Sequence, residues 1–359
     1  MISIIMPTYN RADVLKRSII SVLRQSYSEY ELIIVDDGSL DKTKKIVESF
    51  NEEKIKYIKL EHNSGANYAR NIGMKASKGE LIAFLDSDNE WDEDYLFEQY
   101  KVFTDEDVDI SFFKMKRIYP DGHARVFPEL TERIDNETIF NKMLVGNIMD
   151  TNVTCIRRMC YIKYGGFDEH LPRFQDWDLF MGYLEKGAKA VFNNSVKARC
   201  YTLSDSISLR NDFREKAFSI ILVKHYLYMQ QQKCLDDFII SMLSLVGEQI
   251  STDLFDVLKE IITNHTLLGK MNKIILYGYG NNGKKLYKLL KKLDIISAVV
   301  DKYCEIPYEL DVPFYRNVQD NDRADCILVS IKDGRMDIVN ELIAKTSIPV
   351  YNTSDVFNA

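Results

Sequence analysis

A chain of 359 residues exceeds a typical single domain and predicts two or three compact units, each able to bury a core. Its 47 Lys and Arg against 54 Asp and Glu give a formal net charge of -7, which argues against a general nucleic-acid-binding protein and against a polybasic membrane anchor. The longest apolar runs fall far short of the roughly 20 residues that span a bilayer, so no transmembrane helix is predicted.

The first ten residues, MISIIMPTYN, enter a strand pattern at once and lack the basic flank and long apolar core of a secretory signal. The six cysteines are scattered without a CxxC pair, which predicts reduced structural thiols and neither a zinc site nor a redox motif. We therefore expect the protein in the cytoplasm, with at most a peripheral contact at the inner face of the membrane.

The first hundred residues alternate apolar runs with helical patterns, which predicts a parallel sheet with right-handed crossovers. Strands are expected at Ile2–Met6, Glu31–Val35, Ile55–Leu60 and Leu81–Leu85, and helices at Val14–Arg24, Lys42–Phe50 and Ala66–Ala76. The pattern is irregular from Val108 to Thr154 and helical from Asn211 to Lys270.

A second strand-turn-helix pattern begins at Lys273 with KIILYGYGNNGKKLYKLL, and SAVVD, CILVSI and IPVYN read as further strands. The sequence thus predicts an α/β fold in three parts: an α/β domain over 1–210, a helical connector over 211–270, and a small Rossmann-like α/β domain over 271–359.

Two carboxylates two residues apart, Asp86 and Asp88, follow the apolar run Leu81–Leu85. That run lacks polar alternation, which favours a strand covered on both faces of a parallel sheet. Ligands bind at the carboxyl edge of such sheets, so the pair indicates a metal and phosphate site. The alternative is that the two acids cap a helix beginning near Trp91.

Four motifs occur in order: IIMPTYNR, IIVDDGSLDKT, NSGANYARNIGMKASKGELIAFLDSDNEW, and GGFDE followed by QDWDLFMGYLEKG. Together they resemble the family 2 glycosyltransferases of the GT-A fold, over roughly residues 1 to 210. The resemblance implies an inverting, metal-dependent enzyme of bacterial surface polysaccharide biosynthesis. Such an enzyme moves a sugar from a UDP-sugar donor to a glycan or lipid-linked acceptor.

A departing nucleoside diphosphate gathers negative charge, which a divalent cation such as Mn²⁺ or Mg²⁺ can balance. By resemblance, Asp88 is the direct metal ligand and Asp86 reaches the ribose or the metal. Asp36 is implied to accept a hydrogen bond from the uracil imide. The other implied nucleotide-binding residues are Pro7, Thr8, Tyr9 and Arg70. Two alternatives stay open: Asp37 and Ser39 only form a turn, and Arg70 is a surface arginine paired with an acid.

An inverting transferase needs a base for the acceptor hydroxyl, and by resemblance that base is Asp176. Relatives usually carry Glu-Asp here, so Gln175 is a departure that bears on the acceptor contact. The residues implied on the acceptor side are Gln175, Trp177, Gly166 and Asp168. Core packing is the alternative for Trp177, and Asp178 reads as a structural cap. Near the end of this unit Ser208 and Arg210 are left open as contacts to the diphosphate.

Gly278, Gly280 and Gly283 form GxGxxG between a strand and a helix, and Asp301 ends the next strand. This context predicts a second nucleotide site, with phosphate at the helix start and Asp301 on a ribose hydroxyl. The unit has about ninety residues, roughly half a dinucleotide-binding domain, and no catalytic Tyr-xxx-Lys follows. A structural or regulatory module is therefore favoured over an NAD-dependent sugar oxidoreductase. A nucleotide-sensing scaffold without turnover is the remaining alternative.

Overall fold

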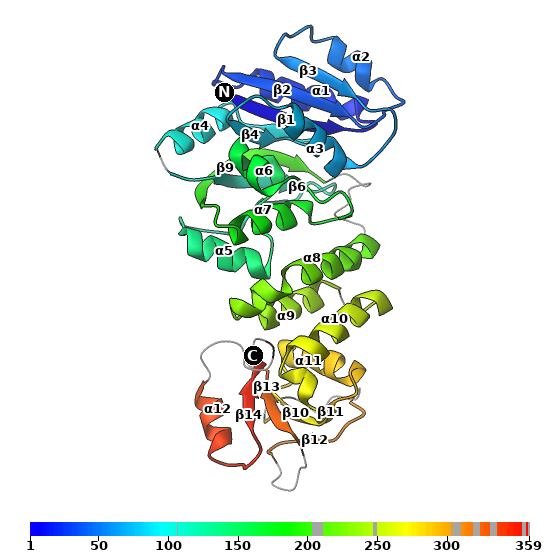
Figure 1. The fold of residues 1–359 in the computed structure, drawn as a ribbon, viewed down its shortest axis with the longest axis vertical. Helices are drawn as coiled ribbons and strands as arrows, with labels where there is room; N and C mark the ends of the chain where they lie inside the picture. Colours follow the sequence, from blue (N-terminus) through cyan, green and yellow to red (C-terminus); the bar gives the residue numbers. More distant parts are fainter. Residues whose placement is uncertain are drawn as a thin grey trace. The chain divides into compact units, whose positions relative to one another are not determined.

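The computed structural model describes residues 1–105, 107–202, 211–246, 250–302, 304, 310–318, 324–330, 336–353 and 357. The chain divides into two compact units, Met1–Phe213 and Arg214–Ala359 (Figure 1). Nearly all of the segment expected as a helical connector belongs to the second unit, because its helices contact that unit's own elements.

A nine-stranded mixed sheet forms the centre of the first unit. In spatial order its strands are β3 (Ile55–Lys59), β2 (Tyr30–Asp36), β1 (Ile2–Thr8), β4 (Leu81–Phe84), β8 (Thr154–Arg157), β6 (Ile110–Ile118), β9 (Ala190–Tyr201) and β5 (Glu90–Trp91), with β7 (Ala124–Phe127) beside β6. The first four are parallel, and β8 joins β4 to β6 in antiparallel pairs. Every residue of β1 and β4 is buried, as the unbroken apolar runs predict.

Helices cover both faces of this sheet. They are α1 (Ala12–Leu23), α2 (Thr43–Glu48), α3 (Ala66–Ala76), α4 (Tyr95–Asp105), α5 (Asn136–Val145), α6 (Arg158–Tyr164) and α7 (Gln175–Glu185), with a short 3-10 turn η1 (Thr151–Val153) before β8. Leu15 and Ile19 of α1 pack with Ile34 on one face. Ala69 of α3 packs with Val35 on the other face. Alternate residues of β2 therefore point to opposite helical layers.

The parallel register brings three strand ends to one edge. Thr8 lies beside Asp36, and Ile5 lies beside Phe84. The loops that follow β1, β2 and β4 therefore converge at the carboxyl edge, where ligands of open α/β sheets bind.

The second unit begins with helices and ends in a parallel sheet. The helices are α8 (Asn211–Gln231), α9 (Leu235–Val246), α10 (Thr252–His265), the 3-10 turn η3 (Leu268–Lys270), α11 (Asn281–Lys292) and α12 (Met336–Ile343). The strands, in spatial order, are β12 (Phe314–Tyr315), β11 (Ile296–Val300), β10 (Ile274–Tyr277), β13 (Cys326–Val329) and β14 (Val350–Asn352). The four strands expected from sequence are present, and the two-residue strand β12 was not predicted.

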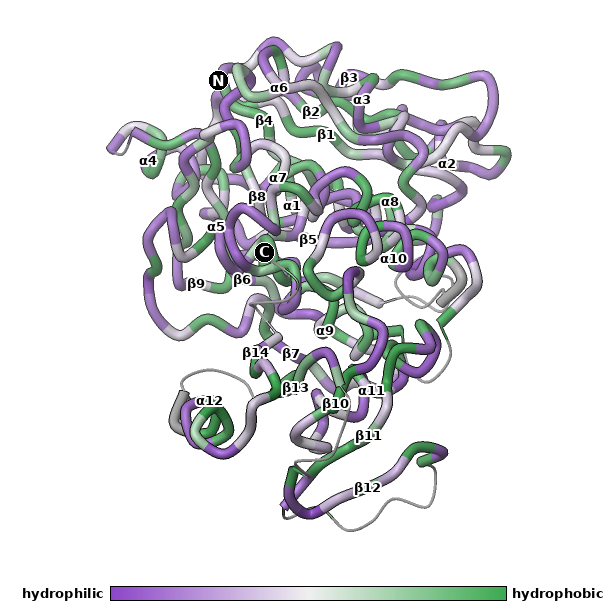
Figure 2. Tube along the Cα trace, turned by 60° about the horizontal axis from the view of Figure 1, so that its bottom comes forward, coloured by the Kyte–Doolittle hydropathy of each residue, from purple (hydrophilic) through white to green (hydrophobic). Residues whose placement is uncertain are grey.

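Within the described residues, no helix combines the length and apolar character needed to cross a bilayer. The 21-residue helix α8 mixes hydrophilic and hydrophobic residues along its length (Figure 2). All six cysteines are free thiols, as expected.

Candidate active site

The turn after β4 carries Asp86 and Asp88, and the buried amide of Asn152 holds it. Asn152 Oδ1 accepts from the backbone N–H of Asp86 at 2.8 Å and from Asn89 Nδ2 at 3.0 Å. Asn152 Nδ2 donates to Asp86 Oδ2 at 3.0 Å. Because Asn152 is only 4% exposed, these bonds are shielded from water and fix the turn. The two acids do not cap a helix near Trp91, since Trp91 lies in β5 and α4 begins at Tyr95.

Arg17 and Tyr201 hold the same turn from another side. The Arg17 guanidinium donates to the backbone carbonyl of Asp88 and lies 3.7 Å from the centre of the Tyr201 ring. The backbone N–H of Tyr201 donates to Asn89 Oδ1 at 2.9 Å. Burial, together with the nearby charge of Asp86, raises the pKa of Asp88 to about 6. A cation placed between these two carboxylates would relieve their repulsion.

Arg70 is buried and pairs with the acidic turn. Its Nη2 lies 2.6 Å from Asp86 Oδ1, and the residue is 3% exposed, so it is not a surface arginine. Two buried polar atoms at this edge, Arg70 Nε and Thr8 Oγ1, have no hydrogen-bond partner in the part of the chain that the structure describes. Buried polar atoms are normally paired, so these two are exceptions, and both are covered by the surrounding protein.

The loop after β1 keeps an aromatic ring at the surface. Pro7 is buried, whereas Tyr9 is 40% exposed. Asn10 adopts φ of 49°, donates its backbone N–H to Ser39 Oγ at 2.8 Å and accepts from Leu40 N at 2.9 Å. The loop is thus tied to the turn after β2, and Tyr9 is available to a planar group.

Asp36 requires a correction. It is 0% exposed, its Oδ1 accepts from Ser39 N at 2.7 Å, and its Oδ2 accepts from the Tyr57 hydroxyl. In this structure Asp36 therefore lies inside the fold and orders the turn, where a base cannot reach it. Asp37 does more than form that turn, because it accepts from Ser64 N at 2.7 Å and from Gly65 N at 2.8 Å at the start of α3.

Asp176 is the second residue of α7 and accepts from Trp177 N at 2.8 Å. Phe174, which precedes the helix, adopts a left-handed φ of 60°, a costly conformation for a residue with a side chain. Burial, and then the charge of Asp150, raises the pKa of Asp176 to about 7, while the charge of Arg70 opposes that rise. Asp176 therefore belongs to the same charge cluster as the turn after β4.

Asp150 connects this carboxylate to the turn. Its Oδ1 accepts from Asn152 Nδ2 at 2.9 Å, and Arg117 Nη2 lies 3.4 Å from its Oδ2. Neither Asp150 nor Asn152 was identified from the sequence, because both lie in the segment that reads as irregular. The only local signal was that two polar residues, Asp150 and Asn152, lie just before the strand TCIR.

On the expected acceptor side, two residues serve packing. Trp177 is 2% exposed and donates Nε1–H to the Met143 carbonyl, so it belongs to the core and is not a sugar-stacking surface. A Cβ on Gly166 would lie 2.3 Å from Asn71 Oδ1, so this glycine permits contact with α3. The Asp168 carbonyl accepts from Asn67 Nδ2 at 2.8 Å. Gln175, in contrast, is half-buried at the start of α7.

Among the described residues, no group of three His, Cys, Asp or Glu side chains is assembled to hold a metal. A divalent cation bound at Asp88 would take its other ligands from phosphate oxygens and water. Ser208 and Arg210 lie outside the residues that the structure describes.

Comparison with known proteins adds independent information. Residues 3–171 match the family described as glycosyl transferase family 2. A "putative teichuronic acid biosynthesis glycosyltransferase", TuaG of Bacillus subtilis, is 30% identical over 214 residues, which cover 58% of this chain and 81% of that protein.

A shorter match joins the chain to WfgD of Escherichia coli, a "UDP-Glc:alpha-D-GlcNAc-diphosphoundecaprenol beta-1,3-glucosyltransferase". The two are 45% identical over 91 residues, which cover 25% of this chain and 36% of that protein. Among solved structures, residues 1–349 of S. aureus TarS in complex with UDP-GlcNAc align with a TM-score of 0.60 and 21% identity. That alignment covers 73% of this chain and 80% of the TarS chain, and it supports a common fold.

Proposed function

Because this chain belongs to glycosyl transferase family 2 and has the GT-A fold, we propose that it moves a sugar from a UDP-sugar to an acceptor hydroxyl. The acceptor is a glycan or a lipid-linked sugar of a bacterial surface polysaccharide, and the reaction inverts the anomeric centre. The observation that carries the proposal is the hydrogen-bonded network of Asp86, Asn152 and Asp150, because the charge of Asp150 also acts on the nearby carboxylate of Asp176.

The relatives support the donor and acceptor classes. WfgD is named for a UDP-glucose donor and a diphosphoundecaprenol-linked acceptor, and TarS is solved with UDP-GlcNAc. TuaG is named for teichuronic acid synthesis. These are statements about those proteins, and we extend their chemical class to this chain.

The donor would lie along the carboxyl edge of the sheet. Tyr9 offers an exposed ring for the base, and Arg70 pairs with Asp86 in the turn after β4. The diphosphate would face the turn that holds Asp86 and Asp88. Mn²⁺ or Mg²⁺ fits this donor set, because both prefer carboxylate and phosphate oxygens, and would balance the charge of the leaving diphosphate.

Asp176 acts as the base in this proposal. Burial and the charge of Asp150 raise its pKa to about 7, which suits a group that takes a proton and later releases it near neutral pH. The acceptor oxygen forms its bond to the anomeric carbon as the bond to the diphosphate oxygen breaks. The hydroxyl proton passes to Asp176, and a single displacement of this kind inverts the centre.

A donor screen tests the proposal. The full chain is incubated with Mn²⁺, a panel of UDP-sugars and short glycan acceptors, and release of UDP is measured. We expect one donor to be consumed, and proton NMR should show a β linkage from an α-linked donor. An α product would refute the single displacement, and absence of turnover with every UDP-sugar would refute the donor class.

A further inference from the structure

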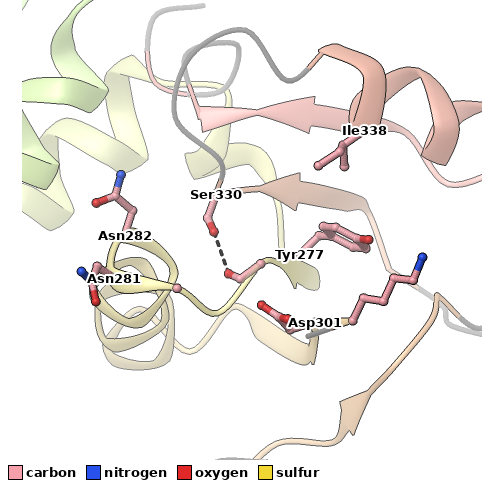
Figure 3. A pocket seen from close by; sticks show the side chains of 9 residues that line it. Tyr277, Asn281, Asn282, Asp301, Ser330 and Ile338 are labelled. Atoms are coloured by element: carbon pink, nitrogen blue, oxygen red, sulfur yellow. Dashed lines mark hydrogen bonds between the residues drawn. The ribbon is translucent and has the colours of Figure 1, made fainter. Parts of the chain in front are cut away.

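The second unit contains a cavity of about 370 Å³ beside its parallel sheet (Figure 3). The described residues that line it are Tyr277, Gly278, Gly280, Asn281, Asn282, Asp301, Lys302, Ser330 and Ile338. It lies where β10 and β13 end, and these neighbours continue the sheet in opposite directions, with β11 and β12 beyond β10 and β14 beyond β13. This is a topological switch point, the place where ligands of open parallel sheets bind.

Two of the three glycines in the GxGxxG motif are required by the packing of the chain itself. Gly278 has φ of 94°, which a residue with a side chain rarely adopts. A Cβ on Gly283 would lie 2.0 Å from the Gly278 carbonyl oxygen, to which the Ser330 hydroxyl also donates at 2.6 Å. Both positions therefore require glycine for the packing of strand, turn and helix.

Gly280 is different. Its φ of -68° suits any residue, and no described atom lies within 4 Å of the place that its Cβ would occupy. The residue nevertheless lines the cavity. Because Gly280 has no side chain, the first turn of α11 is open to the cavity at this position.

Asp301, which the sequence assigns to a ribose hydroxyl, lines the cavity and also binds backbone groups of the chain. Its Oδ2 accepts from Tyr279 N at 2.6 Å, and its Oδ1 accepts from Cys304 N at 2.7 Å. Oδ2 therefore holds the glycine turn, and Oδ1 holds the loop after β11. The cavity also contains the start of α11, a 12-residue helix with no side-chain cap and no acidic residue in its first turn.

We propose that this cavity binds the diphosphate of a nucleotide, at a second site distinct from the transferase site. The first N–H groups of a helix and its dipole favour an anion, and Gly280 leaves room for that anion to approach them. Lys302 adds a basic side chain to the lining. The shared ligand chemistry is a nucleoside diphosphate, which both UDP and NAD⁺ contain.

Hydrogen-deuterium exchange of the full chain in chelator tests this site, with UDP, NAD⁺ or inorganic pyrophosphate as the probe. We expect slower exchange of the amides of residues 278–284 with UDP or NAD⁺. Protection by NAD⁺ alone would identify a dinucleotide as the ligand, and protection by both would identify the diphosphate as the recognised group. If pyrophosphate alone protects, or if no probe does, the nucleotide site is refuted.

Gly280→Ala provides the matched variant, because its backbone tolerates alanine and its new methyl group enters the cavity. We expect the affinity of the second unit for the protecting nucleotide to fall at least about tenfold, because one hydrogen bond to a charged group is lost. The circular dichroism spectrum should be unchanged. Gly146→Ala is the control, since it also adds a Cβ to open space, in the first unit, and should leave affinity unchanged. Parental affinity in Gly280→Ala would overturn the proposal.

Discussion

The turn after β4 in the first unit carries two carboxylates that polar side chains hold in place, whereas the turn after β10 in the second unit is shaped by glycines. Asn152 fixes Asp86 through two hydrogen bonds, and the carboxylates nearby have raised pKa values. In the second unit Gly278 and Gly283 pack backbone against backbone. The carboxyl edge of a parallel sheet can thus carry charged side chains, as in the first unit. It can also carry glycines that leave the backbone open, as in the second unit. The first site should be sensitive to changes of charge, and the second to changes of volume.

The largest effect is expected for Asp88→Asn. A neutral amide is a poor ligand for a hard cation, so transfer should fall by roughly 10³-fold or more, the several kcal/mol that a metal ion contributes. UDP release with saturating Mn²⁺ measures this. Gly280→Ala should transfer sugar at the parental rate, which separates the two sites. Full activity of the parental protein in chelator would contradict the metal requirement.

Asp176→Asn should slow transfer by about 10²- to 10⁴-fold, the usual contribution of a general base. Donor binding, measured by calorimetry with UDP and Mn²⁺, should be unchanged, because the base faces the acceptor. The base must be ionised, so the parental rate should fall as the pH drops through about 7, where the raised pKa of Asp176 lies. A variant that keeps the parental rate and pH profile would place the base elsewhere.

Asn152→Ala removes the amide that joins Asp86 to Asp150. Residues that orient metal ligands typically affect metal affinity or activity by about 10- to 100-fold, and we expect a loss in that range. A larger dissociation constant for Mn²⁺ in the presence of UDP would show that Asn152 positions the metal ligands. Asn193→Ala, which removes a single hydrogen bond to Ser111, is the control. Equal losses in the two variants would argue for a general effect on stability.

Gly283→Ala should give the smallest of these effects on transfer and should act on the second unit alone. Its Cβ would lie 2.0 Å from a carbonyl oxygen, and overpacking of this kind costs about 1–3 kcal/mol. Calorimetry should show a lower unfolding temperature for the second unit only. Gly182→Ala in α7 meets no atom within 4 Å, and it should stabilise the first unit by about 0.5–1 kcal/mol. Unchanged melting of Gly283→Ala would mean that the turn can shift freely.

The parallel half of the first sheet was predictable because β1, β2 and β4 are buried over nearly their whole length and contain apolar runs, while β3 continues the strand-helix alternation. The bounds of α3 were predicted to the residue, Ala66–Ala76. The strands β6, β7 and β8 were not predicted. β7 is largely exposed and carries no apolar run, and β8 is four residues long.

The site was predictable only where a motif marks a residue type. Asp88 and Asp176 follow from the resemblance, but Asn152 reaches Asp86 across 66 residues because β8 pairs with β4, and no local pattern encodes that pairing. The structure was also needed for Asp36 and Trp177, because a motif does not say whether a side chain faces the core or a ligand.

The two tryptophans of the chain have a practical consequence. Trp91 and Trp177 both lie buried in the first unit, where their indole N–H groups donate to the carbonyls of Asn152 and Met143. Indole emission shifts to the red when water reaches the ring. Fluorescence excited at the long-wavelength edge of the indole absorption band will therefore follow the unfolding of the first unit alone. Far-ultraviolet circular dichroism reports on both halves. The difference between the two melting curves is therefore an optical record of the second unit, obtained without any label.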